Sequence, residues 1–283
     1  MPEGPEVEHV RLSLIPIVSK KVKNIKLTEL SQKYQKYKNK QKEFNIFQNK
    51  KIDRIERRGK FLIWVFDSKE VILNHLGMSG KWLFVKDIIL SSSKHAKIIL
   101  DIENFSKKVV FDDVRNFGQF RIFDSYDAVI KYNPIKSIGF DGLALPFPHE
   151  DFLLKLDKPN YANREIGSVL LDQKLVAGIG NIYKSESLYA ARVKPTRLVK
   201  DISIKERKKL GIEISNILQK ALAHQGSTFN IQPFQNPEGI EGSAQNWHKV
   251  YGKGTQSCQE CATEISKIKQ NERSTFFCPK CQK

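Results

Sequence analysis

The chain has 283 residues, and its 48 Lys and Arg outnumber its 31 Asp and Glu, which gives a formal net charge of +17 at pH 7. So large an excess attracts polyanions, and nucleic acid is the leading candidate partner, ahead of an anionic membrane surface. No apolar run approaches the roughly 20 residues that span a bilayer, and we recognise no secretory leader. We therefore expect a soluble intracellular protein of two domains, cytoplasmic or nucleoid-associated.

The chain begins with "MPEGPEVE", which repeats a proline followed by a glutamate. Pro5 and Glu6 suit the first turn of a helix, because proline's missing N–H costs nothing there and a carboxylate is favourable at the positive end of the helix dipole. The helix is supported by apolar residues at every third or fourth position: Val7, Val10, Leu14 and Ile17. The first pair, Pro2 and Glu3, is also open to a chemical role, which needs support from elsewhere in the sequence.

Four segments after this helix have the pattern of β-strands. They alternate apolar and polar residues or are apolar throughout, and they cover residues 51–66, 71–85, 96–104 and 107–123. Short strands at such close spacing predict a β-sandwich or a flattened barrel. The lysine-rich segment "KYQKYKNKQK", residues 33–42, is expected to be a mobile loop, with a solvated basic face as the alternative.

The second half of the chain has helical periodicity instead. Pro146 and Pro148 in "ALPFPHED" predict a linker, and the helical pattern follows over residues 166–178, 182–193 and 202–225.

Between the first two of these helices lies the turn "AGIGNIYKSE". Gly178 and Gly180 permit a sharp reversal, and Asn181 is a natural cap for a helix that starts near Ile182. Backbone N–H groups at such a helix start form a candidate phosphate cradle, although structural capping is the commoner use of this pattern.

Two C-x-x-C pairs are the most specific signal in the sequence. Cys258 and Cys261 form the first pair, and Cys278 and Cys281 form the second. In a reducing compartment such cysteines are metal ligands more often than disulfides, and two pairs complete the tetrahedral shell of one structural Zn²⁺. The residues between the pairs suggest two short strands, so the segment is predicted to be a zinc ribbon. A ribbon alone can serve DNA, RNA or protein binding.

Taken in chain order, "MPEGPEVE", "RRGKFL", "HLGMSG", "DVRNFG", "LLDQKLVAGIGNIYKSESL" and "TFFCPKCQK" resemble the formamidopyrimidine-DNA glycosylase and endonuclease VIII family. The resemblance covers nearly the whole chain. It implies an α+β fold with an N-terminal β-sandwich and an early helix, a helical domain with a helix-two-turn-helix, and a terminal zinc ribbon. It also implies excision of oxidised bases from double-stranded DNA, followed by strand cleavage at the abasic site through β,δ-elimination. We expect a monomer.

On this basis we expect four regions in the chain. They are a catalytic β-sandwich over 1–145, a helix-two-turn-helix domain over 149–226, a lesion-capping loop region over 227–247 and the zinc ribbon over 248–283.

The resemblance assigns the catalytic groups. If Met1 is removed, Pro2 presents a secondary amine, and an α-amino group with an ordinary pKa of about 7.7–8.0 is partly neutral and nucleophilic. Attack on C1′ of the deoxyribose then leaves an iminium that acts as an electron sink. Glu3 is expected to protonate the sugar ring or to transfer the protons of the Schiff base. Glu6 is expected to support Glu3, with a helix-start charge as the alternative for Glu6. Lys60 matches a lysine that assists elimination, although without the resemblance it would be taken as solvated, and Arg273 matches an arginine that grips phosphates and assists δ-elimination.

Other positions match family contacts to DNA. His95 and Arg115 correspond to contacts with the DNA backbone, and Asn181 corresponds to a contact with the phosphate of the abasic site. Where one branch of the family often has a lysine, this chain has Asn163 in "YANRE", which makes Asn163 a further candidate phosphate contact.

Met78, Arg115 and Phe117 match the residues that fill the space left by a flipped-out nucleotide. An apolar side chain, a guanidinium for the orphaned base and an aromatic wedge can replace the lost stacking and pairing. The alternative, Met78 and Phe117 as core residues, is less consistent with the glycines beside them in "LGMSG" and "RNFG".

The motifs leave the lesion class open between two branches. "MPEGPE", "RRGK" and "NREIGSVLLDQ" favour the endonuclease VIII type, which acts on oxidised pyrimidines, whereas "HLGMSG", "DVRNFG", "IYKSESL" and "GSTF" favour the type that acts on 8-oxoguanine and formamidopyrimidines. The complete trio leads us to expect oxidised purines. Two non-catalytic alternatives remain, a zinc-ribbon DNA-binding protein and an RNA-binding ribbon protein of the translational kind.

Overall fold

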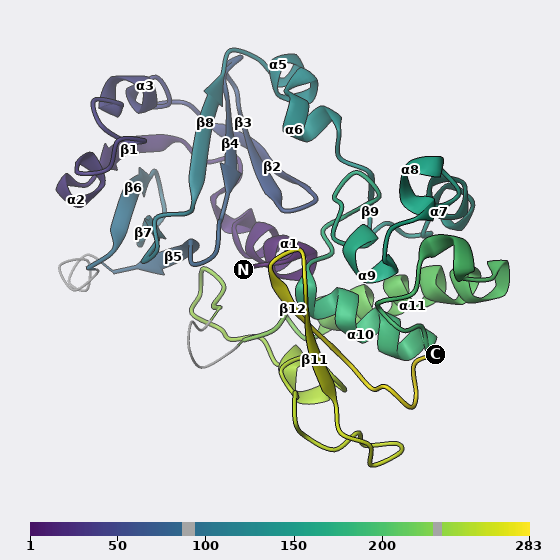
Figure 1. Cartoon of the computed structure of the whole chain (residues 1–283). Coiled ribbons are helices and arrows are strands. Elements are labelled where there is room, and N and C mark those ends of the chain that lie inside the picture. Colours follow the sequence, from purple (N-terminus) through teal and green to yellow (C-terminus); the bar gives the residue numbers. More distant parts are fainter. Residues whose placement is uncertain (87–93, 229–233) are drawn as a thin grey trace. The chain divides into compact units, whose positions relative to one another are not determined.

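The computed structural model describes residues 1–86, 94–228 and 234–283 (Figure 1). Packing divides the chain into two units, each assembled from separate segments. The first unit holds residues 1–2, 6–136 and 225–243, and the second holds residues 3–5, 137–224 and 244–283. The expected lesion-capping loop, 227–247, lies partly outside the described residues, because residues 229–233 are not among them.

Two four-stranded antiparallel sheets form the first unit. One has the order β1-β6-β7-β5, with β1 at Val22–Leu27, β6 at Ala96–Ile102, β7 at Lys108–Asp112 and β5 at Lys81–Val85. The other has the order β2-β3-β4-β8, with β2 at Ile52–Arg58, β3 at Phe61–Phe66, β4 at Val71–His75 and β8 at Gln119–Phe123. The predicted β-sandwich is confirmed.

A hydrophobic core lies between these sheets. The rings of Trp64 in β3 and Trp82 in β5 lie 4.8 Å apart and join the two layers. The early helix is present as α1, Gly4–Ser13, followed by the short 3-10 helix η1, Ile15–Ile17. The apolar residues that predicted it are all buried in this core: Val7, Val10, Leu14 and Ile17. Two short helices, α5 at Tyr126–Lys131 and α6 at Asn133–Lys136, end the main segment of the unit.

The lysine-rich segment 33–42 keeps Lys33, Lys38 and Lys42 exposed, as a solvated basic face requires, but it is also anchored. It joins the short helices α2, Glu29–Gln32, and α3, Gln41–Asn45. Within it Tyr37 is only 2% exposed and belongs to the core. The Lys36 ammonium is bound to two backbone carbonyls far away in the sequence. The sequence could not predict this anchoring, because neither the periodicity nor the charge of the segment distinguishes the buried Tyr37 from its neighbours.

The second unit is mainly helical. Its elements are β9 at Phe140–Asp141, α7 at His149–Leu156, α8 at Pro159–Ala162, α9 at Ile166–Val169, β10 at Val176–Ala177, α10 at Asn181–Ala191, η2 at Val199–Asp201, α11 at Ile204–Ala223 and η3 at Ala244–Trp247. The long helix α11 begins with a capping box in which Ser203 and Glu206 bond to each other's backbone N–H. Helix α10 is terminated by its C-cap residue, Arg192, which adopts the left-handed conformation.

The C-terminal segment forms the predicted ribbon. Strands β11, Ser266–Gln270, and β12, Arg273–Phe277, pair antiparallel and turn through Asn271 and Glu272, which both have positive φ. Their small apolar cluster includes Ile265 and Phe276. None of the helices in the described part of the chain is long and apolar enough to cross a bilayer.

Candidate active site and metal centre

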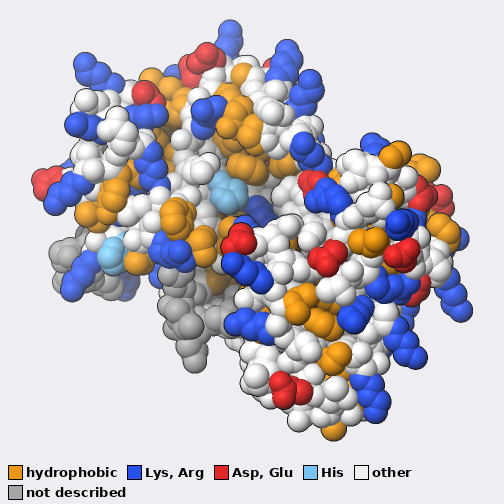
Figure 2. Space-filling model, in the orientation of Figure 1, with side chains coloured by type: hydrophobic (Ala, Val, Ile, Leu, Met, Phe, Trp, Pro, Cys, Tyr) orange, Lys and Arg blue, Asp and Glu red, His pale blue; other side chains and the backbone are white. Residues whose placement is uncertain are grey.

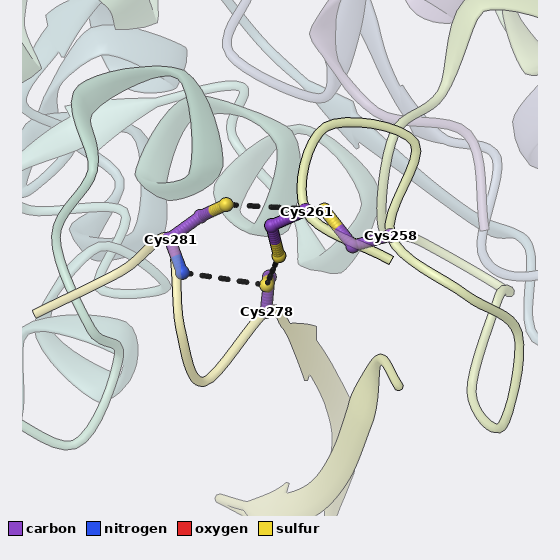
Figure 3. Close-up of side chains that lie close together, drawn as sticks. All are labelled: Cys258, Cys261, Cys278 and Cys281. Carbon is purple, nitrogen blue, oxygen red and sulfur yellow. Dashed lines mark hydrogen bonds between the residues drawn. The ribbon is translucent and has the colours of Figure 1, made fainter. Parts of the chain in front are cut away.

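Four cysteine sulfurs converge at the base of the ribbon (Figure 3). All four Sγ atoms lie within 4.8 Å of one another, with Cys258 and Cys281 3.9 Å apart and Cys261 and Cys278 3.4 Å apart. Tetrahedral zinc with Zn–S bonds of about 2.3 Å separates its sulfur ligands by about 3.8 Å. The four thiolates therefore fit one Zn²⁺, and a closed shell of four protein ligands makes that zinc structural.

Helix α10 supports this centre. The hydroxyl of Tyr189 lies 3.4 Å from Cys258 Sγ, so it donates a hydrogen bond to the sulfur once the thiol is ionised by metal. Arg192, at the end of the same helix, pairs with Glu260 beside the first cysteine pair. The ribbon is thus attached to the second unit through α10.

Glu3 is anchored at the start of α10. Its carboxylate is 3% exposed and accepts backbone N–H bonds from Gly180 at 2.7 Å, Ile182 at 2.8 Å and Tyr183 at 3.3 Å. A Cβ at Gly180 would lie 2.3 Å from Glu3 Cδ, which is why glycine is needed at that position. The backbone adds a bond from Gly4 N–H to Gly178 O at 2.8 Å. The Glu3 carboxylate is thus held rigidly, one peptide bond from Pro2.

This arrangement corrects two expectations about the turn. Asn181 is the first residue of α10 and does not cap it, because the carboxylate of Glu3 takes that role. Three of the N–H groups expected to cradle a phosphate are bonded to Glu3 instead. The sequence could not show this, since the capping residue lies 177 residues away.

The Asn181 side chain binds the ribbon. Its amide nitrogen donates to the carbonyl of Ser274, and its Oδ1 accepts a bond of 2.7 Å from the ammonium of Lys184. Ser274 directly follows Arg273, which is exposed at the start of β12. The structure therefore brings Asn181 and the backbone beside Arg273 together, whereas Asn163 lies exposed at the end of α8.

Sequence reasoning missed two residues of this group. The half-buried Tyr251 has a pKa raised to about 12, first by burial and then by the negative charge of Glu3. Lys184 is fully buried and donates both to Asn181 and, at 2.5 Å, to Thr275 Oγ1. Its position within the helix segment "NIYKSES", directly after the glycine turn, was the available signal.

Lys184 should make folding stability depend on pH. Burial lowers its pKa to about 7, an effect that Glu3 offsets in part and Arg273 increases. Because an unfolded lysine has a pKa of about 10.4, the unfolded chain binds one more proton between pH 7 and about 10, so stability rises with pH there by at most about 1.4 kcal/mol per unit. Below pH 7 the Lys184 side chain is protonated in both states, so the cost of burying its charge applies in full and no longer changes with pH. We expect Lys184→Met to lose this rise in urea unfolding measured from pH 6.5 to 9.5 with zinc present.

The exposed Lys174 offers a control for that experiment. Lys174→Met removes the same charge from the same unit and should keep the pH dependence. Identical pH profiles for the wild type and Lys184→Met would show that the ammonium stays protonated in the folded state.

Glu6 holds a second segment of the first unit. It is 2% exposed, and its Oε1 accepts a bond of 2.7 Å from the N–H of Ser227. Gly226 has a φ of +81°, and a Cβ there would meet the Glu6 side chain at 2.6 Å. Glu6 therefore binds the backbone at Ser227, and it also lies in the first turn of α1, where the alternative placed a helix-start charge. Pro2 is buried, while Met1 is exposed.

Lys60 lies in the turn between β2 and β3 and is only 8% exposed, which excludes a solvated lysine. Near it, burial lowers the pKa of His75 to about 4, and the positive charge of Lys60 adds to that decrease. The neutral imidazole accepts a bond of 3.0 Å at Nδ1 from the N–H of Gly77. His75, which sequence reasoning also missed, thus sits between Lys60 and the "LGMSG" loop.

The two loops with the predicted void-filling residues meet in the first unit. Phe117 is 50% exposed, and the Arg115 guanidinium lies 5.1 Å from the centre of its ring. Ser79, next to Met78, accepts a bond of 2.9 Å from Arg115 N–H. A Cβ at Gly77, whose φ is +67°, would lie 2.4 Å from the carbonyl carbon of Phe117, so only glycine permits this approach. The exposure of Phe117 excludes a core role for it.

His95 lies at the edge of the same region. Its side chain is exposed at the start of β6, and its carbonyl accepts a bond of 3.1 Å from the N–H of Asp113. On the face seen in Figure 2, Lys and Arg side chains are spread over each unit.

The sequence matches three family models in chain order. They are the formamidopyrimidine-DNA glycosylase N-terminal domain over residues 1–120, the formamidopyrimidine-DNA glycosylase H2TH domain over residues 138–232, and the zinc finger found in FPG and IleRS over residues 256–283.

Curated relatives match over full length. The formamidopyrimidine-DNA glycosylases of Wolbachia pipientis subsp. Culex pipiens (strain wPip) and of Listeria monocytogenes serovar 1/2a are both 38% identical to the chain, with 100% of each sequence covered.

Solved structures of similar proteins have the same fold as this chain. Lactococcus lactis Fpg (MutM) in complex with DNA that contains an oxidised pyrimidine is 34% identical, with a TM-score of 0.84 and 100% of both chains covered. The same protein with N7-benzyl-Fapy-dG DNA gives a TM-score of 0.85 at 34% identity over 100% of both chains. MutM (Fpg) from Thermus thermophilus gives a TM-score of 0.85 at 29% identity, over 99% of this chain and 98% of that one.

A β-sandwich, a helix-two-turn-helix and a four-cysteine ribbon together define a zinc-containing DNA glycosylase. The chain belongs to the formamidopyrimidine-DNA glycosylase (Fpg/MutM) family across its full length. It is a DNA glycosylase with AP lyase activity, which confirms the family, the fold class and the zinc predicted from the sequence.

Proposed function

We propose that this enzyme excises oxidised purines, 8-oxoguanine and formamidopyrimidines, from double-stranded DNA with Pro2 as the nucleophile. The observation that carries the proposal is the carboxylate of Glu3, which three backbone N–H groups hold in place beside Pro2 in sequence. A binding protein has no need of a buried carboxylate fixed next to a potential terminal amine.

The reaction begins after removal of Met1. The lone pair of the Pro2 amine forms a bond to C1′ of the deoxyribose, and the bond from C1′ to the base breaks as the base takes up a proton. Glu3 takes up the proton that the Pro2 nitrogen loses after the attack and passes it to O4′ as the C1′–O4′ bond breaks, which opens the sugar ring and leaves the iminium. The resulting iminium acidifies the C2′ proton. Loss of that proton breaks the bond to the 3′ phosphate, and a second elimination breaks the bond to the 5′ phosphate.

Charged groups on both units support the eliminations. Lys60, buried beside a neutral His75, supplies a cation near the leaving base or a bound phosphate. Arg273 and Asn181 are assigned to the phosphates that flank the lesion, and the bond from Asn181 to the backbone next to Arg273 supports a shared role. His95 and Asn163, both exposed, are assigned to more distant phosphates.

The assignment to oxidised purines is supported by the trio of Met78, Arg115 and Phe117 on two interlocked loops. Oxidised pyrimidines are the second candidate substrate class, because Lactococcus lactis Fpg was solved with DNA that contains an oxidised pyrimidine as well as with a formamidopyrimidine. We place the enzyme in the cytoplasm at the nucleoid, where its DNA substrate lies.

One experiment tests both the substrate and the nucleophile. Duplexes that contain 8-oxoguanine, formamidopyrimidine, thymine glycol or 5-hydroxycytosine, each opposite all four normal bases, are incubated with the enzyme in the presence and absence of borohydride. We expect faster excision of the two purine lesions, and a reduced covalent adduct that peptide mapping places on Pro2. Faster excision of the two pyrimidine lesions would favour the second candidate. An adduct on Lys60, or retention of Met1 in the intact mass of an active enzyme, would overturn the assignment of the nucleophile.

A further inference from the structure

Lys36 makes an unusual long-range contact in the first unit. Its Nζ donates to the carbonyl oxygens of Asn116 and Gly118, each at 2.5 Å. These acceptors lie 80 and 82 residues further along the chain, and they flank Phe117 on both sides. A single ammonium therefore holds the backbone immediately before and after the exposed aromatic side chain.

The loop from Asp113 to Gly118 is held from two sides. Asn116 has a φ of +58°, in the left-handed region that asparagine adopts more readily than other residues with a Cβ, which gives the loop its sharp turn. The Asp113 carboxylate fixes one side, because it accepts bonds from Gly118 N–H at 2.7 Å and from Ser79 Oγ at 2.6 Å. The carbonyls of the same loop are bound by Lys36.

Lys36 is itself held in place. The ring of the neighbouring Tyr37 is buried, its centre lies 5.0 Å from the Lys36 ammonium, and it packs at 6.4 Å against the ring of Phe120. The Lys36 side chain is half-buried. Holding an already positioned ammonium costs little side-chain entropy at the moment of DNA binding.

We propose that Lys36 is a positioning residue, whose ammonium holds the loop of Arg115 and Phe117 in the conformation that enters the duplex and reads the base opposite the lesion. The inference rests on the proposed function of those two side chains. It assigns a role to the lysine-rich segment 33–42, which the chemistry described above does not use.

The test compares Lys36→Met with Lys36→Arg and with Lys40→Met. Methionine keeps the aliphatic stem and removes the donors, whereas arginine restores donors to two acceptors. Lys40→Met is a matched control, because it removes the same charge from the same segment. The Lys40 ammonium forms a partly exposed ion pair of 3.7 Å with Glu43. Any general weakening of DNA binding by lost charge is then common to both methionine variants.

The first measurement is hydrogen exchange of peptides that cover residues 114–118 in the free enzyme. We expect at least about 10-fold faster exchange in Lys36→Met, because the loop loses two hydrogen bonds from a charged donor, and near wild-type exchange in Lys36→Arg and Lys40→Met. Unchanged exchange in Lys36→Met would overturn the proposal.

The second measurement is the ratio of single-turnover excision rates with cytosine and adenine opposite 8-oxoguanine. We expect Lys36→Met to reduce this ratio about 5-fold to 10-fold, Lys36→Arg to restore most of it, and Lys40→Met to leave it unchanged. Arg115→Ala is measured in parallel. If Arg115→Ala reduces the ratio and Lys36→Met does not, the positioning role is wrong. If Arg115→Ala leaves the ratio unchanged, the proposed reading by Arg115 is wrong, and the exchange data alone decide whether Lys36 holds the loop.

Discussion

Glu3→Gln should slow base excision at least about 100-fold, the lower end of what a positioned acid or base contributes. The carboxylate accepts three N–H bonds through both of its oxygens. Glutamine offers one acceptor oxygen, and its NH₂ group would face backbone donors at the start of α10. The variant therefore loses the group that transfers protons, and its side chain cannot keep all three hydrogen bonds. Single-turnover excision of 8-oxoguanine, with zinc content and circular dichroism as checks of folding, measures the effect.

Glu6→Gln is the matched control for this variant. Glu6 is equally buried, and its Oε1 accepts a backbone bond from Ser227 N–H that the oxygen of glutamine can also accept. We expect a much smaller loss of excision from Glu6→Gln. Glu3→Asp keeps the charge but is one methylene shorter, so its carboxylate cannot reach all of the donors. Its loss of excision rate should lie between those of Glu3→Gln and Glu6→Gln. Equal losses in Glu3→Gln and Glu6→Gln would mean that Glu3 acts only as an anchor of the N-terminal segment.

Removal of zinc should abolish strand cleavage while the β-sandwich stays folded. The ribbon has only a small apolar cluster around its thiolates, and such a hairpin does not fold without its metal. Its unfolding would release Arg273 and break the contacts of Asn181 and Lys184 with β12. A displacement of about 1 Å can already cost about 100-fold in rate, so we expect a loss of at least that size.

Hydrogen exchange with and without a chelator checks this result. Strands β11 and β12 should lose protection, strands of the first unit should keep it, and added Zn²⁺ should restore cleavage. Cys261→Ser should reproduce the effect of the chelator without one. Loss of protection in the β-sandwich on chelation would contradict the expectation, since the core of that unit contains none of the zinc ligands.

Local patterns in the sequence were sufficient for much of the fold. A continuous apolar run marked the strand around Trp64, and apolar residues at a period of three to four marked the helix from Val7 to Leu14. The spacing of the cysteines is by itself sufficient to indicate the ribbon, because two pairs of thiolates at tight turns have few other uses. Each of these signals is carried by neighbours in the chain.

The sequence by itself determined the class of each unit, the zinc ligands and, through motif resemblance, the residues to assign to chemistry. Only the tertiary structure decided what holds those residues. It capped α10 with Glu3 instead of Asn181, bound Asn181 to the ribbon, buried Lys184 beside it and tied Lys36 to the loop of Phe117. These contacts join residues far apart in the chain, and a hydrogen bond between distant residues leaves no periodicity in either segment. Their existence depends on packing, which brings the donor and the acceptor together only after the core has formed.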